Sequence, residues 1–180
     1  WLNRGERGRT RFLAFRGGYH GDTIATMAVC DPDEGMHALF KGLLPDNAIL
    51  PLPLDEVSTA SLEAWLARNA DGLAGILVEP LVQGAGGMIF HPPEVLRRLR
   101  TLADRHGLYL IFDEIFTGFG RTGSMFALDQ AGVGKLVRSE RGGFREEGIA
   151  PWRSGWVLTG KNNGSEYGVL ETTEGVWLPA

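Results

Sequence analysis

The sequence predicts an α/β protein with a mostly parallel sheet, and three neighbouring segments carry this prediction. Residues 73–78 and 108–112 are continuous apolar runs, which are typical of strands buried on both faces of a parallel sheet. Between them, residues 93–106 place apolar side chains on one side of a helix and most of the arginines on the other. A strand, a helix and a strand over this length form a βαβ unit with parallel strands.

Shorter elements precede this unit. Residues 11–15 are predicted to form a strand that ends before Gly17, and residues 23–29 a short helix that Asp22 or Thr23 caps.

Residues 36–44 are expected to contain a helical turn. Two prolines within residues 50–54 favour an edge strand or a connection there. Apolar residues recur at helical spacing over residues 58–70, and the polar residues with glycine at 69–72 end that helix.

Composition limits the kind of protein this is. The 180 residues, 43% hydrophobic and 22% charged, suit one soluble globular domain or a piece of a larger one. The net charge of −4 does not provide the basic surface that nucleic acids or anionic membranes attract, and no apolar run is long enough to span a bilayer. Cys30 is the only cysteine, so we predict a reducing, cytoplasmic location. The four histidines show no metal-ligand spacing, and no metal site is predicted.

The chain changes character after Val133. The remaining residues are rich in glycine and tryptophan and lack a sustained periodicity, so they offer at most short strands near 155–158 and 167–170. We therefore divide the chain into residues 1–133, which belong to one folded domain, and a tail of residues 134–180 without an assigned fold. The tail is expected to be partly ordered or weakly packed.

Carboxylates follow both long apolar runs directly: Glu79 after the first and Asp113 after the second. Ligands of parallel sheets bind just beyond the carboxyl ends of the strands, so we expect both side chains at one ligand-binding edge. A helix N-cap or a structural ion pair is the alternative for a single aspartate. The glycine-rich residues 84–87 match neither the P-loop nor the dinucleotide pattern, and we expect them to allow an unusual backbone path.

Asp113, an aromatic residue at Tyr19 and a loop arginine at Arg121 together point to pyridoxal phosphate (PLP). A buried aspartate keeps a pyridine nitrogen protonated, and this turns PLP into an electron sink. Ile115 is placed to press on one face of the ring, and Arg121 to bind a substrate carboxylate through two hydrogen bonds. Taken alone, Tyr19 is better interpreted as an ordinary half-buried aromatic, and His20 as a core or surface histidine.

With these residues in place, the sequence resembles the class III, fold-type I PLP-dependent aminotransferases, and within them the biotin-pathway branch. The resemblance runs from about residue 11 to residue 133, and it implies that residues 1–133 are part of the three-layer α/β/α, PLP-binding large domain. The stretches that carry it are residues 15–23 (FRGGYHGDT), 29–32 (VCDP) with Met36-His37, 79–88 (EPLVQGAGGM), 113–115 (DEI) and 118–123 (GFGRTG).

The resemblance implies a role for each matching residue. Tyr19 would stack near the cofactor ring and meet substrate, Asp113 would bind the pyridinium nitrogen, and Ile115 would lie against the opposite ring face. Arg121 would receive the carboxylate of the keto-amino acid substrate. The supporting polar groups would be Asp22 and Glu79. The branch moves an amino group from S-adenosylmethionine to 7-keto-8-aminopelargonate, both small molecules, and its members are homodimers with the active site at the subunit interface.

The sequence also departs from the family. Family chains are longer, and a segment before Trp1 would supply a Gly-Ser phosphate site. The family's Schiff-base lysine lies in a Ser-x-x-Lys-Ala-type stretch that has no counterpart here, because Lys135 comes too early and Lys161 too late. No catalytic residue is therefore assigned, and the chain is expected to be an inactive fragment. Two alternatives stay open: a class III aminotransferase fragment with another ω-amino substrate, and a non-enzymatic remnant.

Overall fold

The computed structural model describes residues 1, 5–33, 39–40 and 42–133, together with the backbone of five strands between residues 135 and 179. The chain divides into two compact units, Trp1–Ala131 and Gly132–Ala180. Each unit is described by itself. Of the predicted helical turn within residues 36–44, residues 36–38 and 41 lie outside the described residues, and with them the Met36-His37 pair; residues 39–40 form a 3-10 turn.

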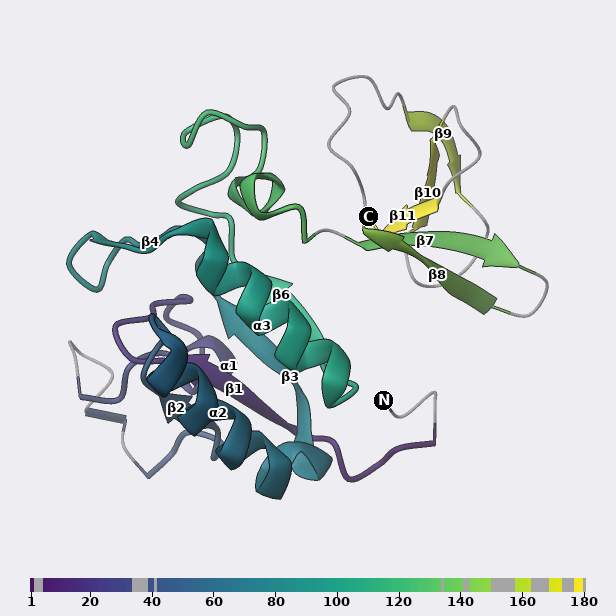
Figure 1. Cartoon of the computed structure of the whole chain (residues 1–180). Helices are drawn as coiled ribbons and strands as arrows, with labels where there is room; N and C mark the ends of the chain where they lie inside the picture. Colours follow the sequence, from purple (N-terminus) through teal and green to yellow (C-terminus); the bar gives the residue numbers. More distant parts are fainter. Residues whose placement is uncertain are drawn as a thin grey trace. The chain divides into compact units, whose positions relative to one another are not determined.

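The first unit is built on a four-stranded parallel sheet in the order β2-β1-β3-β6 (Figure 1). Its strands are β1 (Arg11–Phe15), β2 (Ala48–Leu50), β3 (Leu73–Val78) and β6 (Tyr109–Phe112). The two strands of the predicted βαβ unit, β3 and β6, are parallel neighbours that pair from Gly75↔Tyr109 to Val78↔Phe112. The prediction of a mostly parallel sheet is confirmed. Strand β2 lies at an edge among the described residues, and residues 51–54, which hold both prolines, form a connection after it, one of the two alternatives predicted for that segment.

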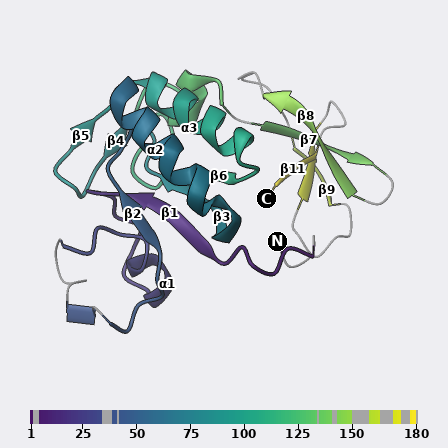
Figure 2. The same cartoon turned by 60° about the horizontal axis from the view of Figure 1, so that its bottom comes forward.

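Helices cover both faces of this sheet. Two long helices, α2 (Glu56–Asn69) and α3 (Pro93–Arg105), lie side by side on one face, and the short α1 (Ile24–Met27) lies on the other (Figures 1 and 2). The residues around each start explain where it begins. Thr23 is the N-cap of α1, and the Asp55 carboxylate accepts a hydrogen bond from the Ser58 N–H at the start of α2. Short 3-10 helices follow at η3 (Ala70–Gly72) and η4 (Ala127–Ala131).

The core forms where the apolar face of α3 meets the sheet. The residues of α3 that are buried are those the spacing predicted: Val95, Leu96, Leu99, Leu102 and Ala103. Strand β3 is buried along almost its whole length, as expected for a strand with neighbours on both sides. Burial of this kind contributes about 25 cal/mol per Å² of apolar surface, so it is the main stabilising term of the unit.

Strand β6 differs from its prediction. It was expected to be buried on both faces, yet Tyr109 and Ile111 are 42% and 40% exposed. The reason is the sheet order: β6 pairs with β3 on one side and is the edge strand among the described residues. An apolar run predicts a strand, but it does not determine how many neighbours that strand has.

The glycine-rich loop forms the turn of a small hairpin between β4 (Val82–Gln83) and β5 (Ile89–Phe90). Gly86 approaches the backbone of Gly17 so closely that a Cβ on Gly86 would lie 2.0 Å from the Gly17 carbonyl oxygen. Gly87 has a φ of 103°, a backbone conformation that residues other than glycine rarely adopt. The expected unusual backbone path is therefore present, and its role is close packing against the turn after β1.

The second unit contains a five-stranded sheet in the order β8-β7-β11-β10-β9. The strands are β7 (Lys135–Glu140), β8 (Gly143–Ile149), β9 (Leu158–Asn162), β10 (Val169–Thr172) and β11 (Trp177–Pro179), and every pairing is antiparallel. Two of these strands overlap the short strands expected near 155–158 and 167–170 by one or two residues. The other residues of those two expected strands lie outside the described part of the chain.

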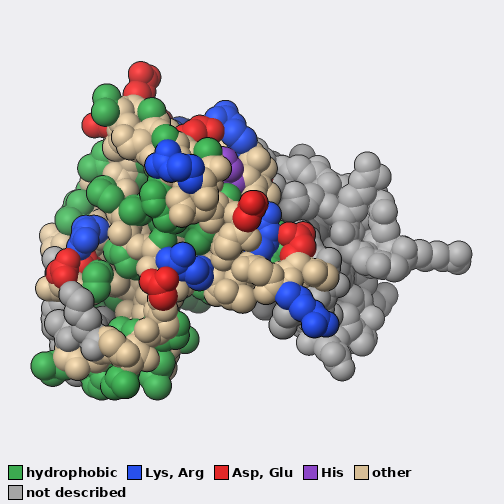
Figure 3. All heavy atoms as spheres, turned by 90° about the horizontal axis from the view of Figure 1, so that it is seen from below, with side chains coloured by type: hydrophobic (Ala, Val, Ile, Leu, Met, Phe, Trp, Pro, Cys, Tyr) green, Lys and Arg blue, Asp and Glu red, His purple; other side chains and the backbone are tan. Residues whose placement is uncertain are grey.

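Figure 3 shows one face of the molecule, on which basic and acidic side chains are interspersed among hydrophobic ones. In the part of the chain that the structure describes, no helix is long and apolar enough to cross a membrane.

Candidate functional site

The site is built at the carboxyl end of the sheet. The Asp113 N–H donates to the carbonyl oxygen of Val78 at 2.9 Å, so the β3–β6 ladder continues one residue past the end of β6. Glu79 is the residue directly after β3. The two carboxylates therefore start from adjacent backbone positions at one edge, as the strand-end argument predicted.

Asp113 is held by His20. The His20 Nδ1 lies 2.8 Å from Asp113 Oδ2, and the Ile115 N–H donates to Oδ1 at 3.2 Å. Both side chains are largely buried, 3% exposed for His20 and 14% for Asp113. The hydrogen bond from His20 is the main cause that lowers the pKa of Asp113 below its usual value, while burial opposes it. Asp113 is thus an ionised acceptor at neutral pH, fixed in direction.

Glu79 connects the turn after β1 to the hairpin. Its Oε2 accepts a hydrogen bond from the Tyr19 N–H and its Oε1 one from the Gly84 N–H, each at 3.1 Å. The side chain is buried, and this desolvation raises the pKa of Glu79. Glu79 therefore holds two backbone segments in place: the turn after β1, through Tyr19, and the β4–β5 hairpin, through Gly84.

Tyr19 lies at the same edge, and the residue is 39% exposed. A hydrogen bond with the Asp22 carboxylate is the main cause that raises the pKa of the Tyr19 hydroxyl. Because its backbone is bound to Glu79 and the next residue, His20, is bound to Asp113, Tyr19 is fixed between the two carboxylates.

A cavity of about 470 Å³ opens beside Asp113. Its apolar walls include Leu77, Ile111, Ile115 and Phe119, and Ile115 is 89% exposed. An ionised Asp113 with fixed oxygens beside these apolar walls suits a flat aromatic ring with a protonated nitrogen. The remaining lining residues are His20, Thr26, Phe112, Asp113 and Glu114.

Arg121 is not among the residues that line this cavity. Its guanidinium carbon lies 5.1 Å from the centre of the Phe116 ring, a cation–π contact. The structure thus brings Tyr19, Asp22, Glu79 and Asp113 to one edge, with Ile115 in the loop that follows Asp113. Of these five residues, Asp113 and Ile115 line the cavity. Arg121 lies further along the same loop as Ile115 and outside the lining.

Sequence reasoning did not assign His20 or Glu114 to the site. Nothing in the spacing around His20 distinguishes it from a core histidine, because its partner lies 93 positions away. The carboxylate pair Asp113-Glu114 was visible in the sequence, but the function of its second member depends on hydrogen bonds that only the fold reveals.

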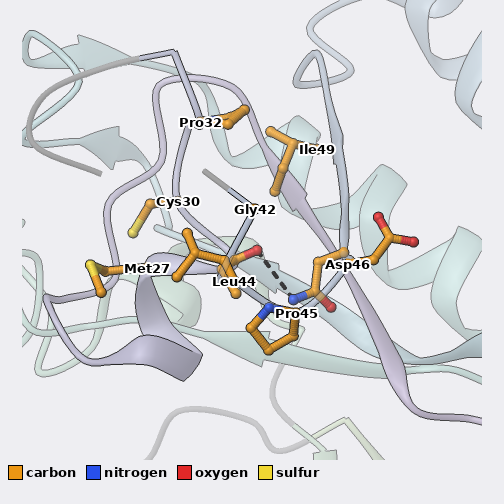
Figure 4. A pocket seen from close by; sticks show the side chains of 10 residues that line it. Met27, Cys30, Pro32, Gly42, Leu44, Pro45, Asp46 and Ile49 are labelled. Atoms are coloured by element: carbon orange, nitrogen blue, oxygen red, sulfur yellow. Dashed lines mark hydrogen bonds between the residues drawn. The ribbon is translucent and has the colours of Figure 1, made fainter. Parts of the chain in front are cut away.

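A second cavity, of about 250 Å³, lies between α1 and the segment before β2 (Figure 4). Met27, Cys30, Leu44 and Ile49 make its lining largely apolar. The Cys30 sulfur accepts from the His20 N–H and contacts the Thr26 carbonyl oxygen, each at 3.1 Å, and burial raises the pKa of the thiol. We therefore assign Cys30 to packing. Among the described residues, no group of three or more His, Cys, Asp or Glu side chains is arranged to hold a metal ion.

Among the solved structures that resemble the chain is an amine transaminase from an uncultivated Pseudomonas species in a PLP-bound form, with a TM-score of 0.66 and 39% sequence identity; the match covers 74% of this chain and 33% of that one. Another is adenosylmethionine-8-amino-7-oxononanoate aminotransferase from Methanocaldococcus jannaschii, with a TM-score of 0.65 and 32% sequence identity; that match covers 71% of this chain and 29% of the other. The fold is that of the fold-type I PLP-dependent aminotransferases.

The aminotransferase class-III family model matches residues 2–135, and the chain belongs to this family. Among curated relatives, adenosylmethionine-8-amino-7-oxononanoate aminotransferase of Mycobacterium leprae is 47% identical over 136 residues, which are 74% of this chain and 31% of the relative. The enzyme of the same name from Corynebacterium glutamicum is 46% identical over 124 residues, which are 66% of this chain and 29% of the relative. The chain thus spans about a third of the length of the curated relatives it matches.

Proposed function

We propose that this chain is the PLP-binding part of a biotin-pathway aminotransferase, which transfers an amino group from S-adenosylmethionine to 7-keto-8-aminopelargonate. The observation that carries the proposal is the His20–Asp113 hydrogen bond at the carboxyl edge of the parallel sheet. The similarity to relatives that bear the name of this enzyme supports the choice of substrates.

The residues present fit the ring of PLP. Asp113 offers one ionised carboxylate whose oxygens are oriented by His20 and by the Ile115 N–H, and it faces a largely apolar cavity. A protonated pyridine nitrogen needs such an acceptor, because the carboxylate keeps the proton on the ring. PLP, when bound, supplies an electron sink for the electrons of a substrate C–H bond.

The other site residues have supporting roles in this proposal. Tyr19 covers one face of the ring and meets substrate, and Ile115 lies against the opposite face. Arg121 receives the substrate carboxylate through its paired N–H groups. Asp22 orients the Tyr19 hydroxyl, and Glu79 holds the Tyr19 backbone in place.

The assembly and the location belong to the same proposal. We infer that the protein is cytoplasmic and acts on small molecules, and that its full-length relatives are homodimers. The lone, buried Cys30 supports a reducing compartment. Exposed apolar side chains next to the site, among them Ile115 and Phe119, support further protein contacts there.

Pyridoxamine 5′-phosphate is the direct probe, because it carries the same ring but no aldehyde and so reports non-covalent recognition. We expect Asp113→Asn to weaken its binding by about tenfold, the loss expected for a hydrogen bond to a charged group. Asp71→Asn, an exposed carboxylate at the opposite end of β3, is the matched control and should bind as the parent chain does. Equal binding by the parent and Asp113→Asn would contradict the proposal.

A second candidate is an aminotransferase with another ω-amino substrate. The likeness to the amine transaminase supports it, since that structure shares 39% identity. The two candidates predict different donors: S-adenosylmethionine for the first, and a simple primary amine for the second. A competition assay against bound pyridoxamine 5′-phosphate with the two donors would distinguish them.

A further inference from the structure

The loop after Asp113 is closed by the neighbouring carboxylate, Glu114. Its Oε2 accepts hydrogen bonds from the Thr117 hydroxyl at 2.7 Å and the Ala127 N–H at 3.0 Å, and its Oε1 accepts from the Leu128 N–H at 2.9 Å. Thr117 is fully buried. Ala127 and Leu128, which lie 13 and 14 positions further along the chain, are thus hydrogen-bonded to Glu114 at the start of the loop. We call residues 115–126 the arginine loop.

Within the arginine loop the backbone follows a tight path. Phe119, Gly120 and Gly123 have φ values of 59°, 86° and 97°, and the Gln130 side-chain amide donates to the Thr122 carbonyl oxygen at 2.6 Å. A non-glycine residue such as Phe119 adopts a positive φ only when its surroundings enforce it. The Glu114 hydrogen bonds supply that restraint at the ends of the loop.

Phe116 connects the arginine loop to the rest of the site. One face of its ring carries the Arg121 guanidinium, whose carbon is 5.1 Å from the ring centre. The ring also packs on Gly84, where a Cβ would lie 3.1 Å from Phe116 Cγ. Gly84 in turn donates its N–H to Glu79. A continuous series of contacts therefore runs from Glu79 to the guanidinium of Arg121.

We propose that Glu114 and Phe116 are positioning residues for Arg121: Glu114 closes the loop that carries it, and Phe116 orients its guanidinium over the ring. This inference rests on the proposed role of Arg121 as the group that receives a substrate carboxylate. Preorganisation matters for such a group, because a long side chain that is already oriented loses less entropy when it binds.

The carboxylate form of Glu114 is essential to this role. Three donors converge on two oxygens that only accept, whereas a glutamine would present an N–H₂ group to at least one backbone N–H. Glu114→Gln therefore opens the loop while it preserves side-chain size. Phe116→Leu removes the aromatic face and leaves the loop hydrogen bonds intact.

The test uses the 180-residue chain and two probes, nonanoate and its neutral analogue nonanamide. The preference for nonanoate over nonanamide measures the contribution of Arg121, and Arg121→Gln should abolish it. Trypsin cleavage after Arg121, relative to cleavage after Arg68 in helix α2, measures local opening of the loop against opening of the whole unit.

Expected results differ for the two variants. Glu114→Gln should reduce the nonanoate preference and raise the relative cleavage after Arg121, each by about tenfold. Phe116→Leu should reduce the preference by about threefold and leave the cleavage ratio unchanged, and Phe116→Tyr should restore it. Glu94→Gln, an exposed carboxylate on α3, is the control and should change neither.

The possible failures are distinguishable. If Arg121→Gln removes the preference but Glu114→Gln and Phe116→Leu do not, the positioning inference is wrong and the proposed role of Arg121 stands. If Arg121→Gln has no effect, that role and this inference fail together, while the Asp113 test of ring binding is unaffected. If Glu114→Gln does not fold, a Phe116→Leu variant with an unreduced preference overturns the inference.

Discussion

The His20 Nδ1 and the Asp113 Oδ2 are 2.8 Å apart, and this hydrogen bond joins the turn after β1 to the end of β6. Strand β3 lies between these two strands in the sheet, so the pair spans the carboxyl edge. It also determines the electrostatics of the site, since His20 is the main cause of the lowered pKa of Asp113. The acceptor is thereby prepared before any ligand arrives.

The lowered pKa of Asp113 predicts a pH dependence of stability. Above the ordinary carboxyl pKa of about 3.9, the folded protein gains from the hydrogen bond that His20 makes to the ionised Asp113, and this gain is lost as the pH falls through the lower folded-state pKa of Asp113. The parent should therefore be more stable than Asp113→Asn by about 1–3 kcal/mol at neutral pH, and the difference should shrink below about pH 4. Urea unfolding at several pH values measures it. A difference that stays constant down to about pH 3 would contradict the assignment.

The contribution of Glu79 to stability should change with pH in the direction opposite to that of Asp113. Burial raises its folded-state pKa, so the folded protein binds the proton more tightly, and the stability contribution of Glu79 declines as the pH rises through that pKa. Glu79→Gln should remove this decline. It should also cost about 1–2 kcal/mol below the ordinary carboxyl pKa, because the amide accepts from only one of the N–H groups of Tyr19 and Gly84.

Hydrogen exchange of those two amides is the measurement for Glu79→Gln. One of them should exchange faster than in the parent, while amides in α3 keep their protection. Unchanged exchange at both would show that Glu79 does not order this backbone.

Gly86→Ala should be strongly destabilising, by about 2–3 kcal/mol, because the new methyl would lie 2.0 Å from the Gly17 carbonyl oxygen and one backbone would have to move. Gly72→Ala is the matched control: its Cβ would meet nothing within 4 Å, and the change should stay within about 0.5 kcal/mol. Thermal unfolding of both variants makes the comparison. Equal midpoints would mean that the hairpin does not pack against the turn as described.

Local patterns in the sequence were enough to predict the longer elements of the first unit, but not the short strands β2, β4 and β5. The apolar runs gave β3 and β6, and the helical spacing gave the buried face of α3, because periodicity reports which side of an element is buried. The same reasoning was wrong about the burial of β6, since the number of neighbours of a strand follows from the sheet order and not from its own residues.

The site was predictable only in part. Glu79 and Asp113 could be placed at one edge because parallel strands end together. The partners that orient them could not be predicted, because His20 and Asp113 are far apart in the sequence and the contacts of Glu114 depend on how the arginine loop closes. The cofactor and substrate roles of Tyr19, Ile115 and Arg121 rest on family resemblance, and they stay predictions.

The 180-residue chain by itself should not catalyse transamination. The reaction needs a lysine that anchors the cofactor covalently and moves a proton between substrate and cofactor carbons, and no Ser-x-x-Lys-Ala-type stretch follows Asp113 in this sequence. Borohydride reduction after incubation with PLP, followed by mass analysis, should show no adduct concentrated on one of Lys41, Lys135 or Lys161. A stable adduct on Lys135 or Lys161, together with turnover of the keto-amino acid, would show that the second unit supplies the missing lysine.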